Sequence, residues 1–297
     1  FPVMEASSSK GAKGVAEMRS SDMPANRWFP GEWDEVKAIV VTCSYSHYPA
    51  SHDNDLYWEA EPILTGVAQY YHYVGGDWNV GGMGPYVSHP DTSNSSFANV
   101  FFYLMDGIQQ GGAEAWVRVE SLADSSCIKR KLNRMGLRSD NMRFIEAPGN
   151  SFWFRDCGPI CFYYGDQDSV AMLDFMYYPG RALDDSLPSA IQEKMGIPNY
   201  ITDIEWEGGN CLVDGAGLVM SSDAIYSGNQ DRDGQIVMRN GNIYYSTKPS
   251  LSQAQVRDSL TTMMGPRCKI LPKFRYDGGT GHIDLYADMW PETEFVF

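Results

Sequence analysis

The sequence is poor in cysteine, in basic residues and in long apolar runs. Six cysteines in 297 residues are too few for a disulfide scaffold, and no apolar run approaches the about 18 residues of a membrane-spanning helix. Lys and Arg number 23 against 38 Asp and Glu, so the formal net charge is −15. This charge argues against nucleic acid as a partner, because its binders need basic surface. It favours a cationic ligand, although acidity also keeps a protein soluble.

Histidine is equally scarce, and four of the five histidines fall in one region. Residues 44–95 contain His47, His52, His72 and His89 together with many tyrosines and glycines. Imidazole is a common metal ligand, but these histidines show no HxH or HExxH spacing. We therefore predict no metal site and no cofactor, and we interpret them as solvated loop residues. A metal-dependent hydrolase that uses them is kept as a separate hypothesis.

Composition divides the chain into a short lead-in and one long domain. Residues 1–27 are rich in Ser, Lys and Gly, which is typical of a mobile terminus. Residues 28–297 contain no linker, and within them we expect residues 44–95 to form an insertion at the mouth of a binding cleft.

The start at Phe1 without an initiator Met and the glycosylation sequon at Asn94 lead us to expect a secreted or extracytoplasmic protein, with the cytoplasm as the alternative.

Three similar units recur from Ser125 onward. In each, a helix-like run ends in Met-Gly and is followed by a strand, a glycine-rich turn and another strand. The helices end at Gly136, Gly196 and Gly265, and the strands follow at residues 142–146, 201–204 and 268–271. A glycine after the last helical turn is a common C-cap. The spacing of roughly 60–70 residues indicates repeated α/β units whose polar turns meet around one axis.

The polar turns of these units carry the candidate functional residues. His282 and Asp284 are two positions apart on a predicted strand, so both side chains would face one substrate. Asp156 follows the aromatic Trp153, and Glu207 precedes a pair of glycines. Several carboxylates, one imidazole and aromatic walls suit a planar cation such as guanidinium.

Each of these residues also has a purely structural interpretation. Asp156 could form an ion pair with the adjacent Arg155, and Glu207 could cap the turn that follows it. Trp153 could be an ordinary core residue, and His282 could be a buried histidine that only satisfies its own hydrogen bonds. The glycines around His282 favour an open site instead.

The motifs resemble the guanidine-modifying superfamily, the pentein fold, and most closely its agmatine deiminase and bacterial-type peptidylarginine deiminase branch. The carrying segments span residues 28 to 297 and are Phe29-Pro30-Gly31-Glu32-Trp33, Trp153-Phe154-Arg155-Asp156-Cys157-Gly158-Pro159, Glu207-Gly208-Gly209-Asn210 and Gly281-His282-Ile283-Asp284. The resemblance implies an α/β propeller of ββαβ repeats around a pseudo-fivefold axis, with about four of the five blades in this chain.

The resemblance also implies a deiminase activity. In this branch a cysteine thiolate attacks the guanidinium carbon, ammonia leaves, and water then releases a ureido product. The implied catalytic residues are Asp156 and Asp284, which hold the guanidinium, His282, which transfers protons, and Glu207, which orients His282. The implied substrate-binding residues are Trp153, Arg155, Asn210, Arg181 and Gly281.

Arg181 bears on the choice of substrate. The bacterial peptidylarginine enzymes present two arginines, separated by one residue, to the carboxylate of a C-terminal arginine, and here only Arg181 matches. Agmatine has no carboxylate, but its enzymes usually carry a Trp-Gly-rich stretch here that this chain lacks. We therefore expect a peptidylarginine substrate that becomes citrulline, with agmatine second. The alternative to an enzyme is a binding protein, a degenerate propeller that binds guanidinium without catalysis.

The family's nucleophilic cysteine lies in the last blade, beyond the histidine motif. The chain stops at Phe297, and no cysteine occupies that motif among Cys43, Cys127, Cys157, Cys161, Cys211 and Cys268. We therefore expect a separate polypeptide, most simply a C-terminal cleavage fragment, to complete the ring and to carry the nucleophile. The other expected partner is an arginine-containing peptide or a small guanidino compound.

Overall fold

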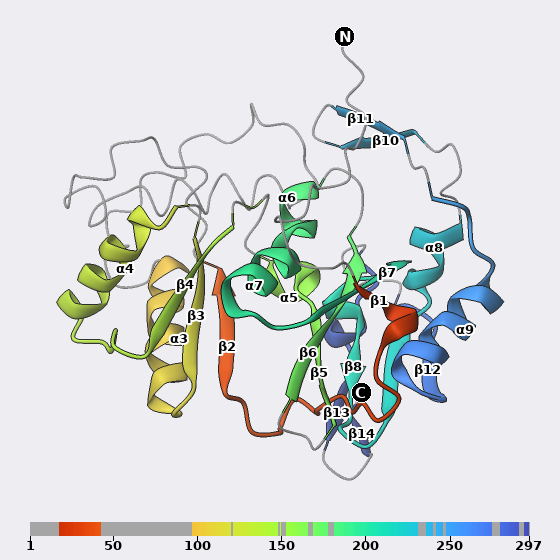
Figure 1. The fold of residues 1–297 in the computed structure, drawn as a ribbon, viewed down its shortest axis with the longest axis horizontal. Coiled ribbons are helices and arrows are strands. Elements are labelled where there is room, and N and C mark those ends of the chain that lie inside the picture. The colour runs from red at the N-terminus through yellow and green to blue at the C-terminus, as the bar shows by residue number, and fades with distance from the viewer. Residues whose placement is uncertain are drawn as a thin grey trace. The chain divides into compact units, whose positions relative to one another are not determined.

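The computed structural model divides the chain into two compact units (Figure 1). One unit combines Phe1–Glu35 with Arg155–Phe297, and the other is Val36–Phe154. The described residues are 18–42, 97–119, 121–147, 149, 153–165, 169–177, 181–230, 236–239, 242–245, 248–274, 280–290 and 294–296. The predicted 44–95 insertion, with its four histidines, lies outside them. Among the described helices, none is both long enough and apolar enough to cross a membrane.

The Val36–Phe154 unit is built on a three-stranded parallel sheet. Its strands are β2 (Ala38–Thr42), β3 (Glu114–Val119) and β4 (Met142–Glu146), paired in chain order, and its helices are α3 (Phe97–Gln110) and α4 (Ala123–Arg134). Parallel neighbours need crossover connections, and the two helices supply them. Val117 of the central strand is fully buried, and Phe102 of α3 and Leu132 of α4 belong to the same core. The predicted strand 142–146 is confirmed.

The other unit contains two ββαβ repeats. In the first, β5 (Ile160–Tyr164) pairs antiparallel with β6 (Ser169–Met176), and β6 pairs parallel with β7 (Asn199–Glu205) after α6 (Ala182–Asp185) and α7 (Leu187–Met195). In the second, β8 (Leu212–Val213) pairs antiparallel with β9 (Leu218–Ser222), and β9 pairs parallel with β12 (Arg267–Leu271). The equal strand order and direction confirm the predicted ββαβ repeat.

Helices and a hairpin fill the connection between β9 and β12. They are α8 (Ala224–Gln230), the antiparallel pair β10 (Ile236–Arg239) and β11 (Asn242–Tyr245), and α9 (Gln253–Met264). After η5 (Ile283–Leu285) comes a second antiparallel pair, β13 (Asp288–Trp290) and β14 (Glu294–Val296). The core of this unit joins Phe162 and Leu173 of the first repeat to Val219 and Leu260 of the second.

Glycines end the helices where the sequence predicts. Gly196 follows α7 with φ 71° and its amide donates to the carbonyl of Gln192, which closes the last turn. Gly265 follows α9 with φ 109°. Such positive φ values are costly for any residue with a Cβ, so the Met-Gly signals do mark helix ends.

The structure extends this unit further toward the N-terminus than we predicted. Residues 18–27 were expected to be part of a mobile lead-in. Instead Met18–Arg19 forms β1, which pairs parallel with β7, and η1 (Ser20–Asp22) follows. The side chain of Met23 is buried in the core, and the amide of Trp28 donates to Tyr163. The apolar side chain and the backbone pairing together hold this segment in place.

Candidate functional site

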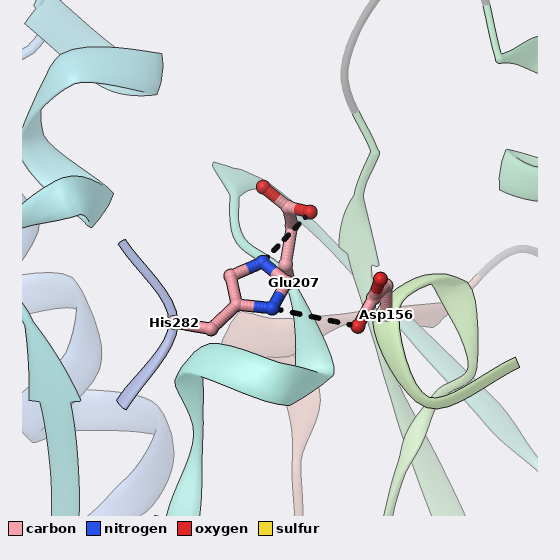
Figure 2. A group of neighbouring side chains, drawn as sticks. All are labelled: Asp156, Glu207 and His282. Carbon is pink, nitrogen blue, oxygen red and sulfur yellow. Dashed lines mark hydrogen bonds and ion pairs between the residues drawn. The ribbon is translucent and has the colours of Figure 1, made fainter. Parts of the chain in front are cut away.

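Three short turns bring the predicted catalytic residues together (Figure 2). Asp156 lies in α5 (Phe154–Cys157), Glu207 precedes η4 (Gly208–Asn210), and His282 precedes η5. The His282 ring is buried between the two carboxylates. Its Nε2 lies 3.0 Å from Oε2 of Glu207, and its Nδ1 lies 3.6 Å from Oδ1 of Asp156. These contacts favour the functional interpretation of both carboxylates, because Glu207 makes no side-chain cap to η4.

Asp284 joins this group from the turn that follows His282. A Cβ built on Gly209 would lie 2.5 Å from Nδ1 of His282, 2.9 Å from Oδ1 of Asp156 and 3.1 Å from Oδ2 of Asp284. The three polar atoms therefore surround one point next to the Gly209 backbone. A planar cation bound beside these atoms would meet carboxylates from two different turns, which is the arrangement that guanidinium prefers.

The predicted strand geometry of His282 and Asp284 is wrong. His282 has extended backbone angles, with φ −69° and ψ 135°, but a 3-10 turn begins at the next residue and contains Asp284. Alternation along a strand therefore does not place the two side chains. The turn does so instead, because it folds Asp284 back toward the atoms that surround Gly209.

Burial and charge shift the pKa values of the site in one direction. Burial raises the pKa of Asp156 to about 6; the charge of His282 opposes this, while Glu207 and Asp284 add to it. Burial by itself lowers the pKa of His282, but the hydrogen bond that its ring donates to Glu207 and the three carboxylate charges outweigh this effect, and the net pKa is raised. His282 therefore carries its proton at higher pH than an ordinary histidine does.

Asp284 lies at the exposed edge of the site, yet the surrounding protein still desolvates its carboxylate and raises its pKa. The charges of His282 and Arg155 act in the opposite direction. Three carboxyl groups with one imidazole thus share a small space. A bound cation would relieve their mutual repulsion, so the site is electrostatically prepared for a positive ligand.

Arg155 does not pair with Asp156, which removes the ion-pair interpretation of that carboxylate. Its Nη2 lies 2.5 Å from Oε1 of Glu32 and 3.1 Å from the carbonyl oxygen of Cys211. Glu32 belongs to the Phe29–Trp33 motif near the N-terminus. Arg155 thus links two motifs, and its charge favours ionised Asp284, while its predicted substrate-binding role stays a prediction.

Arg181 is held by a buried carboxylate. Its Nε donates to Oδ2 of Asp184 at 2.6 Å, its Nη2 pairs with the same oxygen, and Asp184 is fully buried. The guanidinium also lies over the ring of Tyr177, 5.3 Å from the ring centroid. Its charge still acts on Asp156 and lowers the pKa of that group. Arg181 therefore influences the site with its charge already balanced by Asp184.

Asn210 and Gly281 have structural tasks that sequence reasoning missed. Oδ1 of Asn210 accepts from the amide of Ser222 at 2.8 Å, and the Ser222 hydroxyl donates to the carbonyl oxygen of Gly281. Gly281 has φ 75°, and a Cβ there would lie 2.7 Å from that of Ala224. The buried Ser222 at the end of β9 thus ties the Glu207 turn to the His282 turn. Its sequence context, an ordinary serine in an apolar strand, gives no signal of this role.

Trp153 is 39% exposed, so the plain core interpretation is wrong. It belongs to the Val36–Phe154 unit. The predicted contact of Trp153 with a substrate stays a prediction.

The predicted secreted or extracytoplasmic location of the protein also stays a prediction.

The described cysteines differ in exposure. Cys157 and Cys211 are buried and Cys161 is exposed. Burial raises the pKa of Cys211 to about 12 and that of Cys268 to about 11. Both thiols stay protonated at neutral pH and are therefore poor nucleophiles.

The same cluster has the donor set of a cation site. One ligand atom each from Asp156, Glu207 and His282 lie within 4.8 Å of one another. A divalent metal would have to displace the carboxylate contacts of the imidazole, since both ring nitrogens already face a carboxylate. An organic cation leaves those contacts in place, so the geometry favours guanidinium over a metal.

Comparison with known proteins gives a family match and several similar relatives. The model of the Porphyromonas-type peptidyl-arginine deiminase family matches residues 95–297. An agmatine deiminase from Medicago truncatula is 27% identical over 165 residues, which cover 49% of this chain and 40% of that protein. The agmatine deiminase of Enterococcus faecalis superposes with a TM-score of 0.57 at 18% identity, over 94% of this chain and 61% of that one. For the C. jejuni agmatine deiminase the TM-score is 0.55 at 16% identity, over 91% and 62%.

These similarities confirm the predicted fold class, an α/β propeller of the pentein type. In each of the three protein comparisons the chain spans less than two thirds of the relative's length.

Proposed function

The chain belongs to the Porphyromonas-type peptidyl-arginine deiminase family, and from that premise we propose that its site binds the guanidinium of a peptidylarginine and takes part in converting it to citrulline. The observation that carries the proposal is the meeting of Asp156, Asp284 and His282 around the Gly209 backbone. Asp156 and Asp284, from two turns, would accept the paired N–H groups of a planar cation, and the buried imidazole of His282 lies next to both carboxylates.

The residues divide the chemistry between them. Asp156 and Asp284 hold the guanidinium flat and keep its carbon open to a thiolate. When the thiolate adds to that carbon and one C–N bond breaks, His282 donates its proton to the departing ammonia. The resulting neutral imidazole then accepts a proton from water, whose oxygen attacks the same carbon and releases the thiol and a ureido product. Glu207 keeps His282 in place and raises its pKa, so the imidazole holds its proton to higher pH than an ordinary histidine does.

We propose that the thiolate comes from a polypeptide segment outside residues 1–297. Cys211 and Cys268 are poor candidates because burial raises the pKa of each thiol. Cys161 lies on β5 and is exposed, but desolvation also raises the pKa of its thiol to about 11, so it is no better an internal candidate. A haloacetamidine reacts with a thiol that lies beside a guanidinium site, so the peptide that it labels identifies the nucleophile.

Agmatine is the second candidate substrate, and the pairing of Arg181 with Asp184 agrees with it. A carboxylate clamp needs a cation that can accept a new anionic partner, whereas Arg181 is already paired with the buried Asp184. Agmatine carries an ammonium group and no carboxylate. An internal peptidylarginine also presents no carboxylate at this place, so both substrates agree with the pairing, and a C-terminal arginine agrees least.

The test is a direct assay of the native preparation with an acetylated arginine peptide and with agmatine. We expect release of ammonia and appearance of a ureido product, both lost in His282→Ala. A matched control is Asp258→Asn on the exposed face of α9, which should retain full activity. Binding of the guanidino ligands without any turnover would support the non-catalytic alternative. The absence of both binding and turnover would refute the proposed site.

A further inference from the structure

We propose that Gly209 is a positioning residue of the guanidinium site, because its missing side chain lets Asp156 from one turn meet His282 and Asp284 from another beside its backbone. The proposal rests on the function proposed above for this same site. In the sequence, Gly208 and Gly209 indicate only a turn. In the structure, Gly208 allows two backbones to approach closely, and Gly209 leaves space for neighbouring side chains.

The need for glycine at position 209 is spatial. Its backbone angles lie outside the left-handed region that favours glycine, so an alanine there would meet no conformational penalty. The penalty would come from the neighbours: the added carbon would lie 2.5 Å from Nδ1 of His282 and 2.9 Å from Oδ1 of Asp156. Both distances are shorter than carbon and polar atoms tolerate, so an atom must move.

The neighbours have little freedom to move. The His282 ring is buried, and its two nitrogens lie 3.0 Å from Glu207 and 3.6 Å from Asp156. A methyl group at position 209 must therefore either rotate the ring away from Glu207 or push α5 away from η4. Each movement separates groups that bind one small cation together.

Gly208 marks a second close contact between α5 and η4, which a movement of α5 away from η4 would break. A Cβ at Gly208 would lie 1.9 Å from the carbonyl oxygen of Arg155, so the two backbones are in direct contact there. Gly208 thus sets the approach of the two turns, and Gly209 provides the space between them that Asp156 and His282 occupy.

The test compares Gly209→Ala with Gly107→Ala. The Cβ of the second variant meets nothing within 4 Å in α3, so it makes the same chemical change in open space. We expect Gly209→Ala to remain folded, to lower the pKa of His282 measured by NMR, and to weaken agmatine binding by calorimetry. A displacement of reacting groups by about 1 Å reduces turnover on the order of a hundredfold. Gly107→Ala should leave all three quantities unchanged.

The pKa of His282 separates this inference from the proposed function. If wild type binds no guanidino ligand but Gly209→Ala still lowers that pKa, the function fails and the positioning role stands. A folded Gly209→Ala with unchanged pKa and unchanged agmatine affinity overturns the positioning role.

Stability gives a second measurement if Gly209→Ala unfolds too readily for titration. In the His282→Ala background the ring is gone and the methyl group has space, so the loss of melting temperature caused by Gly209→Ala should become smaller. An equal loss in both backgrounds would show that the methyl group does not meet His282, and it would also overturn the proposal.

Discussion

Nε2 of His282 lies 3.0 Å from Oε2 of Glu207, although 75 positions separate the two residues in the chain. One belongs to the turn after β7 and the other to the turn after β12. The two strands end equivalent ββαβ repeats, so the repeat itself brings an acid and an imidazole into contact. The properties of the site follow from that contact.

Replacing Glu207 with glutamine should lower the pKa of His282. Glutamine keeps the shape and can still hydrogen-bond, but it removes the charge that holds the imidazolium. Since burial alone lowers this pKa, we expect the variant to titrate below the wild type. The measurement is the pH dependence of the His282 ring resonances. Glu193→Gln on α7 is the control, and an equal His282 pKa in wild type and Glu207→Gln would contradict the assignment.

Asparagine at either Asp156 or Asp284 should weaken the binding of a guanidino ligand. Loss of one partner of a desolvated charge pair costs about 2–5 kcal/mol. Asp156 is the more enclosed of the two, so we expect the larger effect there. Calorimetry with agmatine measures the affinity, and the exposed Asp258→Asn is the reference. Wild-type affinity in both variants would exclude these carboxylates from the site.

The stability and the ligand affinity should change in opposite directions with pH. The pKa of Asp156 in the folded state, about 6, lies above its ordinary value of 3.8, so the folded protein binds this proton more tightly than the unfolded chain does. Stability is then lost as pH rises through about 6, by about 1–3 kcal/mol from this group. His282 has the same sign, and its contribution declines as pH rises above 6.5.

Guanidinium binding needs ionised carboxylates, so its affinity should increase over the same interval in which stability falls. Denaturant unfolding and calorimetry, both from pH 4 to 8 in steps, measure the two quantities. In Asp156→Asn both pH dependences should become flatter. Parallel changes of stability and affinity in the wild type would contradict the shifted pKa of Asp156.

Asp184→Asn should alter the choice between guanidino ligands. The variant removes the buried partner of Arg181, and such a loss destabilises by about 3–5 kcal/mol. Arg181 could then accept a carboxylate, so the affinity for arginine relative to agmatine should rise. Glu32→Gln is the matched control because it removes the partner of the exposed Arg155, where the effect on stability should be about 0–1 kcal/mol. An unchanged affinity ratio in Asp184→Asn would show that Arg181 does not face the ligand.

Ser222→Ala should loosen the link between the two catalytic turns. The hydroxyl donates to Gly281 and accepts from the amide of Ala224, and it is fully buried. Leaving the Gly281 carbonyl without this donor costs about 1–3 kcal/mol. We expect a lower melting temperature and a lower turnover in the assay of the native protein. The exposed Ser227→Ala in α8 should change neither, and equal behaviour of the two variants would exclude a positioning role for Ser222.

Local signals in the sequence determined the repeat and its helices. Gly196 and Gly265 mark helix ends because only glycine accepts their positive φ without cost, and apolar alternation marks β4, β7 and β12. The same patterns placed Asp156, Glu207 and His282 in turns at equivalent positions of successive units. That equivalence is enough to predict that the three residues meet, since repeated units set their turns around one axis.

Only the tertiary structure decided what each side chain contacts. The sequence paired Asp156 with Arg155 as an alternative, but the neighbouring backbone directs Arg155 to Glu32, more than a hundred positions away. Alternation suggested a strand for His282 and Asp284, whereas the carbonyl of Gly281, held by Ser222, leads into a 3-10 turn. The requirement for glycine at position 209 also has no local signature, because it arises from His282 and Asp156, which reach that point from distant parts of the chain. Spacing and composition describe the neighbours along the chain, and burial and contact across turns depend on how the repeats pack.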